Sequence, residues 1–104
     1  EAENEVNGPT QAAYTEINKI RSRANLPNLA SNLSKDEFRE AVWNERNLEL
    51  ALEQIRWYDL KRTDRLGSVL SATGAPWNDK FLLFPIPQQE IDASNGLITQ
   101  NPGY

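Results

Sequence analysis

The chain has 104 residues, of which 11 are basic and 15 acidic, so its formal net charge is −4. It contains no histidine and no cysteine, which excludes a Ser-His-Asp triad, thiol catalysis, disulfides and zinc sites with nitrogen or sulfur ligands. The acidic balance argues against a nucleic-acid partner, because binding to phosphates favours a basic surface. At this length we expect a single domain over residues 1–104.

The first part of the sequence predicts a short helix followed by a longer one. We interpret residues 1–6 as the last turns of a helix, and Gly8 can take the left-handed conformation that ends it. Pro9 suits the first position of the next helix, which we expect to run to about Ala24. Its apolar residues are spaced by three or four and form one stripe, namely Ala13, Ile17, Ile20 and Ala24.

A second long helix is predicted to begin after Ser34 and to end near Gln54 or Ile55. Ser34 and Glu37 match the capping box, in which each side chain binds the backbone N–H of the other residue. An apolar stripe follows, consisting of Phe38, Ala41, Val42, Leu48, Leu52 and Ile55. Glu45 falls on this stripe, where a carboxylate needs a cationic partner because an unpaired buried charge is very unfavourable.

The second half of the sequence predicts a shorter helix and then mostly irregular chain. The helix is expected from about Trp57 to Leu66, and residues 68–80 are expected to form a loop because they contain glycine, proline and small polar residues. Two prolines follow the apolar run Phe81–Phe84, which favours an extended segment packed on the helices over a strand of a sheet. One helical turn is expected at residues 88–91. The predicted fold is all-α, a helical hairpin or small bundle with an extended, proline-containing C-terminal segment.

Glu45, Glu49 and Glu53 are spaced by four residues and share one face of the predicted helix. Two of them could act as the acid and nucleophile of a retaining glycosidase, although such carboxylates normally face each other across a substrate. Ion pairs with nearby cations such as Arg46 and Arg56 explain the pattern better. We therefore predict no catalytic residue, no metal site and no cofactor.

The aromatic residues Trp43, Trp57 and Tyr58 offer a surface of the kind that stacks on sugar rings. Aromatic residues beside a buried stripe more often anchor a core, because a small domain needs its large apolar groups for that purpose. Trp77 differs, since it stands in a glycine- and proline-containing loop, where exposed aromatics more often serve recognition. Core packing is still the favoured interpretation for all of them.

Several stretches match more than the general pattern of helices. The run from Asn44 to Ala51, continued from Arg56 to Arg62, resembles the E-R-x-x-E-L-A … R-W-x-D-L-K-R signature of the SusD/RagB family. The tail from Leu83 to Asp92 and from Leu97 to Tyr104 is similar to the L-x-P-I-P-x-x-E-I-D … N-P-G-Y ending of that family. The segment from Ile20 to Ala24 resembles its V-R-x-R-A helix end. Together these motifs cover nearly the whole chain in the order of the family.

This resemblance implies the C-terminal portion of an outer-membrane lipoprotein exposed at the cell surface. Such proteins bind a nutrient, with an oligosaccharide as the expected class, and deliver it to a TonB-dependent transporter of the SusC type; they are not enzymes. The implied fold has helix pairs of tetratricopeptide type beneath an irregular ligand-binding half. Attachment to the membrane is expected only through a lipid anchor absent from this chain. The sequence departs from the family at Leu52 and Gln54, where members often have a bulky aromatic residue and a glycine.

The resemblance supplies no ligand-binding residue for this chain, because most members bind sugar outside their C-terminal portion. The matching signature residues are assigned to scaffold packing instead. We expect Glu45 and Glu49 to pair with Arg46 or Arg56 and so to join the second long helix to the third helix. The expected structural ion-pair network comprises Glu45, Arg46, Glu49, Arg56 and Asp59.

Two other functions are left open by the sequence. A helical protein–protein interaction module would take a peptide or a transporter loop in a groove between helices and would have no affinity for glycans. A retaining glycosidase is the less favoured alternative, and its activity on an aryl glycoside would be lost in a Glu49→Gln variant.

Overall fold

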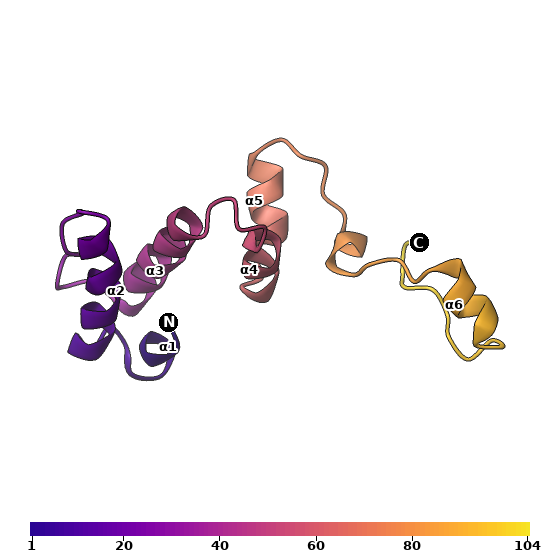
Figure 1. Cartoon of the computed structure of the whole chain (residues 1–104), viewed down its shortest axis with the longest axis horizontal. Coiled ribbons are helices and arrows are strands. Elements are labelled where there is room, and N and C mark those ends of the chain that lie inside the picture. The colour runs from indigo at the N-terminus through magenta and orange to yellow at the C-terminus, as the bar shows by residue number, and fades with distance from the viewer. The chain divides into compact units, whose positions relative to one another are not determined.

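The computed structural model describes residues 1–104 and contains helices without any strand. The chain divides into two compact units, Glu1–Gln54 and Ile55–Tyr104. The first contains α1 (Ala2–Asn7), α2 (Gln11–Arg23) and α3 (Lys35–Glu49). The second contains α4 (Arg56–Arg62), α5 (Leu66–Ala72), the 3-10 helix η1 (Asp79–Leu82) and α6 (Gln88–Ala93) (Figure 1). The predicted all-α class is confirmed.

The start of α2 lies slightly later than the sequence predicts. Gly8 has a φ of 79° and ends α1, as expected. Pro9 is not the first helical residue, because Thr10 is the N-cap and its hydroxyl oxygen accepts a hydrogen bond from the backbone N–H of Ala13 at 3.3 Å. A threonine side chain that satisfies a free N–H of the first turn fixes the helix start more strongly than the proline does.

The core of the first unit lies between α2 and α3. Tyr14 and Ile17 of α2 and Phe38 and Val42 of α3 form one buried cluster. The rings of Tyr14 and Phe38 meet edge to face, with their centroids 4.8 Å apart. The stripes that the sequence predicts therefore meet at Ile17, Phe38 and Val42, and Tyr14 adds its ring to them.

α2 and α3 run in the same general direction, side by side (Figure 1). Their starts meet at Tyr14 and Phe38, and their ends meet where Arg21 of α2 reaches Glu45 of α3. Two helices that follow each other can run this way only if the connecting chain returns along the first one. Residues 24–34 make that return.

Three side chains of α2 hold this returning loop through its backbone. The hydroxyl of Tyr14 accepts the N–H of Leu33 at 3.1 Å, and Asn18 Oδ1 accepts the N–H of Leu29 at 2.9 Å. Arg21 Nε donates to the carbonyl oxygen of Pro27 at 2.8 Å. Positions 14, 18 and 21 are spaced by four and three residues, so they share one face of the helix. This face adjoins the predicted apolar stripe through Ala13, Ile17 and Ile20, and its role in fixing the loop was not predicted.

α1 runs antiparallel to α3 and is joined to it by polar contacts. Glu1 accepts a hydrogen bond from Trp43 Nε1 at 3.1 Å, while Asn4, which is 1% exposed, donates to the carbonyl oxygen of Lys35 at 3.0 Å.

At the start of α3 the predicted capping box between Ser34 and Glu37 is present. The hydrogen bonds that Ser34 donates from its side chain and backbone hold the pKa of Glu37 below its ordinary value.

The end of α3 differs from the prediction. The helix ends at Glu49 rather than near Ile55, because Leu52 and Gln54 have φ values of 68° and 59°, which no α-helix tolerates. Leu48 and Leu52 are 59% and 98% exposed, so the predicted buried stripe continues only as far as Glu45. Leu52 and Gln54 are also the two positions at which the sequence departs from the pattern of the family that it resembles.

The helix predicted from residue 57 to residue 66 is two helices. α4 ends at Arg62, where Thr63 donates its hydroxyl to the carbonyl oxygen of Asp59 at 2.9 Å and Asp64 takes a φ of 55°. Gly67, which was expected to end the helix, lies within α5, and the expected loop over residues 68–72 is helical. The left-handed residue at position 64 breaks the helix, and no proline or glycine stands there to signal the break.

The apolar run Phe81–Phe84 is only partly extended. Asn78 caps η1 by accepting the N–H of Lys80 at 2.9 Å, which places Phe81 in a 3-10 turn. Extended backbone begins at Leu83. Leu83 and Phe84 are 45% and 63% exposed, so the expected packing on the helices is wrong for this second half of the run, whereas Phe81 and Leu82 are half-buried. The predicted helical turn after the prolines is confirmed as α6.

Candidate functional site

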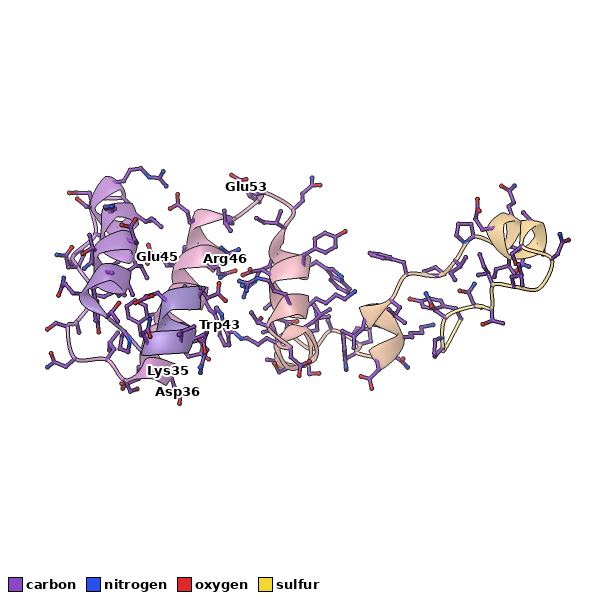
Figure 2. All side chains as sticks on the ribbon, turned by 90° about the horizontal axis from the view of Figure 1, so that it is seen from below. Lys35, Asp36, Trp43, Glu45, Arg46 and Glu53 are labelled. Carbon is purple, nitrogen blue, oxygen red and sulfur yellow. The ribbon has the colours of Figure 1, made fainter.

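Glu45 is the carboxylate that the sequence singled out, and the structure buries it. Its side chain lies on the side of α3 that faces α2 (Figure 2), and the residue is 5% exposed. Arg21 Nη1 donates to Glu45 Oε2 at 2.6 Å, while the Nε of the same arginine binds Pro27. A buried carboxylate in such a pair is stabilised only while its cation is present. The pair therefore joins α2, the returning loop and α3 at one point.

Glu49 makes a second ion pair with α2, one turn further along α3. Its partner is Arg23, two residues after Arg21. The side chains of Arg23 and Glu49 are 69% and 33% exposed, compared with 17% and 7% for Arg21 and Glu45. Because water screens the outer pair, loss of one partner should destabilise the protein more at the inner pair than at the outer pair.

The structure gives these glutamates other partners than the sequence suggested. We expected Arg46 or Arg56 to bind Glu45 and Glu49, joining the second long helix to the third. Arg46 follows Glu45 directly, and consecutive residues do not face the same side of a helix. Arg21 was overlooked, although it lies four residues after the buried Ile17, which is the spacing that places a side chain on the buried face.

The remaining members of the expected network lie in α4. Asp59 is 7% exposed and accepts hydrogen bonds from Arg62, at 2.9 Å from Nε and 2.7 Å from Nη2. Arg56 Nη1 lies 4.0 Å from the other carboxylate oxygen of Asp59. Glu53 lies in the turn after α3, so the expected face of three glutamates contains two.

A groove of about 600 Å³ lies in the first unit, and we call it the α2–α3 groove. Its lining combines apolar residues, among them Ala13, Ile17, Ile20 and Val42, with carboxylates and two cations. The lining residues are Glu1, Glu3, Ala12, Ala13, Glu16, Ile17, Lys19, Ile20, Phe38, Val42, Glu45, Arg46, Glu49 and Leu50. Phe38 is the aromatic residue of this lining, and it is only 1% exposed, so its ring has no open face for a sugar to stack on.

A further cluster of charges joins α1 to α3 at the surface. Arg39 places two nitrogens, Nε and Nη2, on the two oxygens of Glu5, each at 2.6 Å, and it also pairs with Asp36. These hydrogen bonds hold the pKa of Glu5 below its ordinary value. A planar guanidinium that binds both oxygens of a carboxylate fixes orientation as well as charge. The cluster positions α1 rather than a ligand.

Trp77, the loop aromatic, packs against its own unit. Its ring lies so close to Gly67 of α5 that a Cβ there would come within 2.9 Å of it. It also meets the ring of Phe81 edge to face, with centroids 6.2 Å apart. This agrees with the packing interpretation and not with free recognition. Tyr58 of α4, in contrast, is 58% exposed.

Comparison with known sequences identifies the family. The family model described as the SusD family matches residues 1–78. SusD-like protein P2 of Formosa agariphila is 34% identical over 116 aligned residues, which cover 100% of this chain and 23% of the relative. The chain thus spans about a quarter of the length of the relatives it matches.

Solved structures agree with the sequence match. A SusD superfamily protein from Parabacteroides distasonis has a TM-score of 0.79 and 32% identity, covering 99% of this chain and 24% of its own. Surface glycan-binding protein A from Bacteroides thetaiotaomicron has a TM-score of 0.68 and 34% identity, covering 89% of this chain and 20% of its own. The helical architecture is that of these SusD-like proteins, and the chain belongs to the SusD family.

Proposed function

We propose that this chain is a helical scaffold portion of an outer-membrane protein that binds a nutrient and passes it to a TonB-dependent, SusC-like transporter. An oligosaccharide is the proposed nutrient class, supported by the similarity to a surface glycan-binding protein. In this proposal the chain is the C-terminal part of the protein, and a lipid anchor outside it holds the protein at the cell surface.

The observation that carries the scaffold role is the Arg21–Glu45 pair. Both side chains are largely withdrawn from water and bind each other, and Arg21 also binds the carbonyl oxygen of Pro27. A carboxylate that serves catalysis or sugar binding has to reach a ligand, whereas Glu45 is already bound on the inside of the unit. The same reasoning argues against the glycosidase alternative, and we propose no catalytic role for Glu45 or Glu49.

The test separates scaffold residues from ligand residues in the full-length protein. Affinity electrophoresis in gels that contain single polysaccharides should retard the full-length protein with at least one of them, while the 104-residue chain alone should migrate unretarded. Glu45→Gln should lower the melting temperature of the full-length protein and leave its retardation unchanged. Loss of retardation in Glu49→Gln with an unchanged melting temperature would place the ligand at this helix and contradict the scaffold role.

A second candidate function is favoured by the α2–α3 groove. A lining of apolar and charged side chains suits an amphipathic peptide better than a sugar, so a protein–protein interaction module without carbohydrate binding is the alternative. In that case no polysaccharide would retard the full-length protein. Ile20→Glu, at a groove residue that is 37% exposed, would then weaken capture of the partner.

A further inference from the structure

The C-terminal part of the chain keeps its shape without a buried side chain. None of the residues 79–104 is buried, and Phe84 and Leu97 are 63% and 91% exposed. Hydrophobic burial, the usual source of order, is therefore weak here. Order in this segment has to come from hydrogen bonds and turns.

The side chain of Gln100 makes the two hydrogen bonds to Ile86 that a paired strand would make. Gln100 Oε1 accepts the backbone N–H of Ile86 at 2.8 Å, and Gln100 Nε2 donates to the carbonyl oxygen of the same residue at 2.9 Å. Two hydrogen bonds exchanged with the N–H and C=O of one residue are the pattern that a neighbouring antiparallel strand would supply. The amide group of glutamine, which has one acceptor and two N–H donors, reproduces this pattern.

The next residues extend this pairing along the same backbone. Asn101 Nδ2 donates to the carbonyl oxygen of Phe84 at 2.6 Å. The hydroxyl of Tyr104 donates to the carbonyl oxygen of Leu83 at 3.1 Å. Side chains of residues 100–104 thus bind the extended backbone of residues 83–86. We call residues 100–104 the strap.

Lys80 contacts two residues of the strap, Gly103 and Tyr104. Its Nζ lies 4.9 Å from the centroid of the Tyr104 ring, a cation–π distance. Its aliphatic stem lies against Gly103, where a Cβ would come within 2.8 Å of Lys80 Cβ. The strap therefore closes a loop that starts at Ile86, contains α6 and returns at Gln100.

We propose that the strap opens and closes as a local unit while the helical core of the first unit stays folded. Its hydrogen bonds are made by part-buried or exposed side chains, and each contributes little on its own. Segments with few buried apolar contacts open at a lower free energy than the core. When the strap opens, it releases the extended backbone of residues 83–86 and the loop between them. Residues 83–104 then form an order–disorder element whose closed state depends on Gln100.

Amide hydrogen exchange of the whole chain, followed by NMR, tests this proposal. The N–H of Ile86 should exchange faster than that of the buried Phe38, which binds the carbonyl oxygen of the N-cap residue Ser34 in the first turn of α3. Gln100→Ala should speed the exchange of Ile86 about tenfold and leave Phe38 unchanged, because the lost side chain supplies both bonds of the pairing. Gln88→Ala is the matched control, since it removes a hydrogen bond to Asp92 within the same loop and spares the strap.

Two results would overturn the proposal. The first is exchange of Ile86 as slow as that of Phe38, with both responding together to added urea, which would mean that the strap opens only with the whole fold. The second is an equal exchange rate of Ile86 in wild type, Gln100→Ala and Gln88→Ala, which would mean that Gln100 does not hold it. Tyr104→Phe, which removes a single hydroxyl and keeps the ring, should give a smaller acceleration than Gln100→Ala.

Discussion

Arg21 and Glu45 lie 24 residues apart in sequence, and their charged groups meet at 2.6 Å between α2 and α3. The pair is the innermost ion pair of the first unit, with side chains 17% and 7% exposed. Removal of one of these two charges should therefore destabilise the unit more than removal of a charge from an exposed pair.

Replacing Glu45 by Ala should cost about 3 kcal/mol of unfolding free energy, because it leaves the guanidinium of Arg21 without its carboxylate inside the unit. Urea unfolding followed by circular dichroism measures this change. Glu49→Ala is the control, since it breaks a more exposed pair and should cost no more than about 1 kcal/mol. Equal losses in the two variants would show that burial does not distinguish the pairs.

The loop that returns along α2 should depend on single side-chain hydrogen bonds. Tyr14→Phe keeps the aromatic ring in the core and removes the acceptor of the Leu33 N–H, so it should cost about 1 kcal/mol. Asn18→Ala should cost a similar amount through Leu29. Thr15→Ala, which removes an exposed bond to the backbone of its own helix, should change the unfolding free energy by less than either. A larger loss in Thr15→Ala would contradict the role given to the loop contacts.

Gln54→Gly should stabilise the chain. Gln54 has a φ of 59°, a conformation that costs a residue with a side chain roughly 1 kcal/mol and costs glycine almost nothing. Part of this gain is offset by the greater freedom of glycine in the unfolded chain, so the net rise should be about 0.5 kcal/mol. Glu53→Gly, at the neighbouring position without a positive φ, should destabilise; the two melting temperatures should move in opposite directions.

Stability should fall in acid through Glu5 and Glu37. Both have a pKa below the ordinary 4.5, lowered mainly by Arg39 in one case and by Ser34 in the other. A carboxylate whose pKa is lower in the folded state stabilises above the unfolded pKa, and this contribution is lost as pH falls from about 4.5 through the folded value. Glu5→Gln should flatten the melting temperature profile below pH 4.5. An unchanged profile would exclude Glu5 as a source of the acid sensitivity.

Gly103→Ala should open the strap, and Gly96→Ala should not. Both glycines have positive φ values, 89° and 85°, so alanine meets the same backbone strain at either position. Only at Gly103 would the new methyl group strike Lys80. Limited chymotrypsin digestion should therefore cleave after Leu83, whose carbonyl oxygen binds Tyr104, several times faster in Gly103→Ala than in Gly96→Ala. Equal cleavage rates would show that the contact with Lys80 does not hold the strap.

The sequence identified the elements whose signals are local and missed those set by tertiary contacts. The capping box at Ser34 and the stripe through Phe38 and Val42 were predicted correctly, because both depend on residues a few positions apart. The ends of α3 and α4 were missed, because Leu52, Gln54 and Asp64 take left-handed conformations that their residue types do not signal.

The candidate site shows the same limit. Glu45 could be recognised as a buried carboxylate from its place on an apolar stripe. Its partner could not be chosen, because that choice depends on the direction in which α2 and α3 pack. The sequence pattern favoured cations near the glutamates in the chain, such as Arg46 and Arg56, whereas Arg21 lies 24 residues before Glu45.

The parallel course of α2 and α3 has an electrostatic consequence of its own. Helices that point the same way align their macrodipoles, so the partial negative charges of both C-terminal ends come together and repel each other. Arg21 and Arg23 occupy the last turn of α2, and Arg46 occupies the last turn of α3. These three guanidinium groups place positive charge where that repulsion is greatest, so each arginine counteracts the field of the helix ends in addition to binding its carboxylate or other partner.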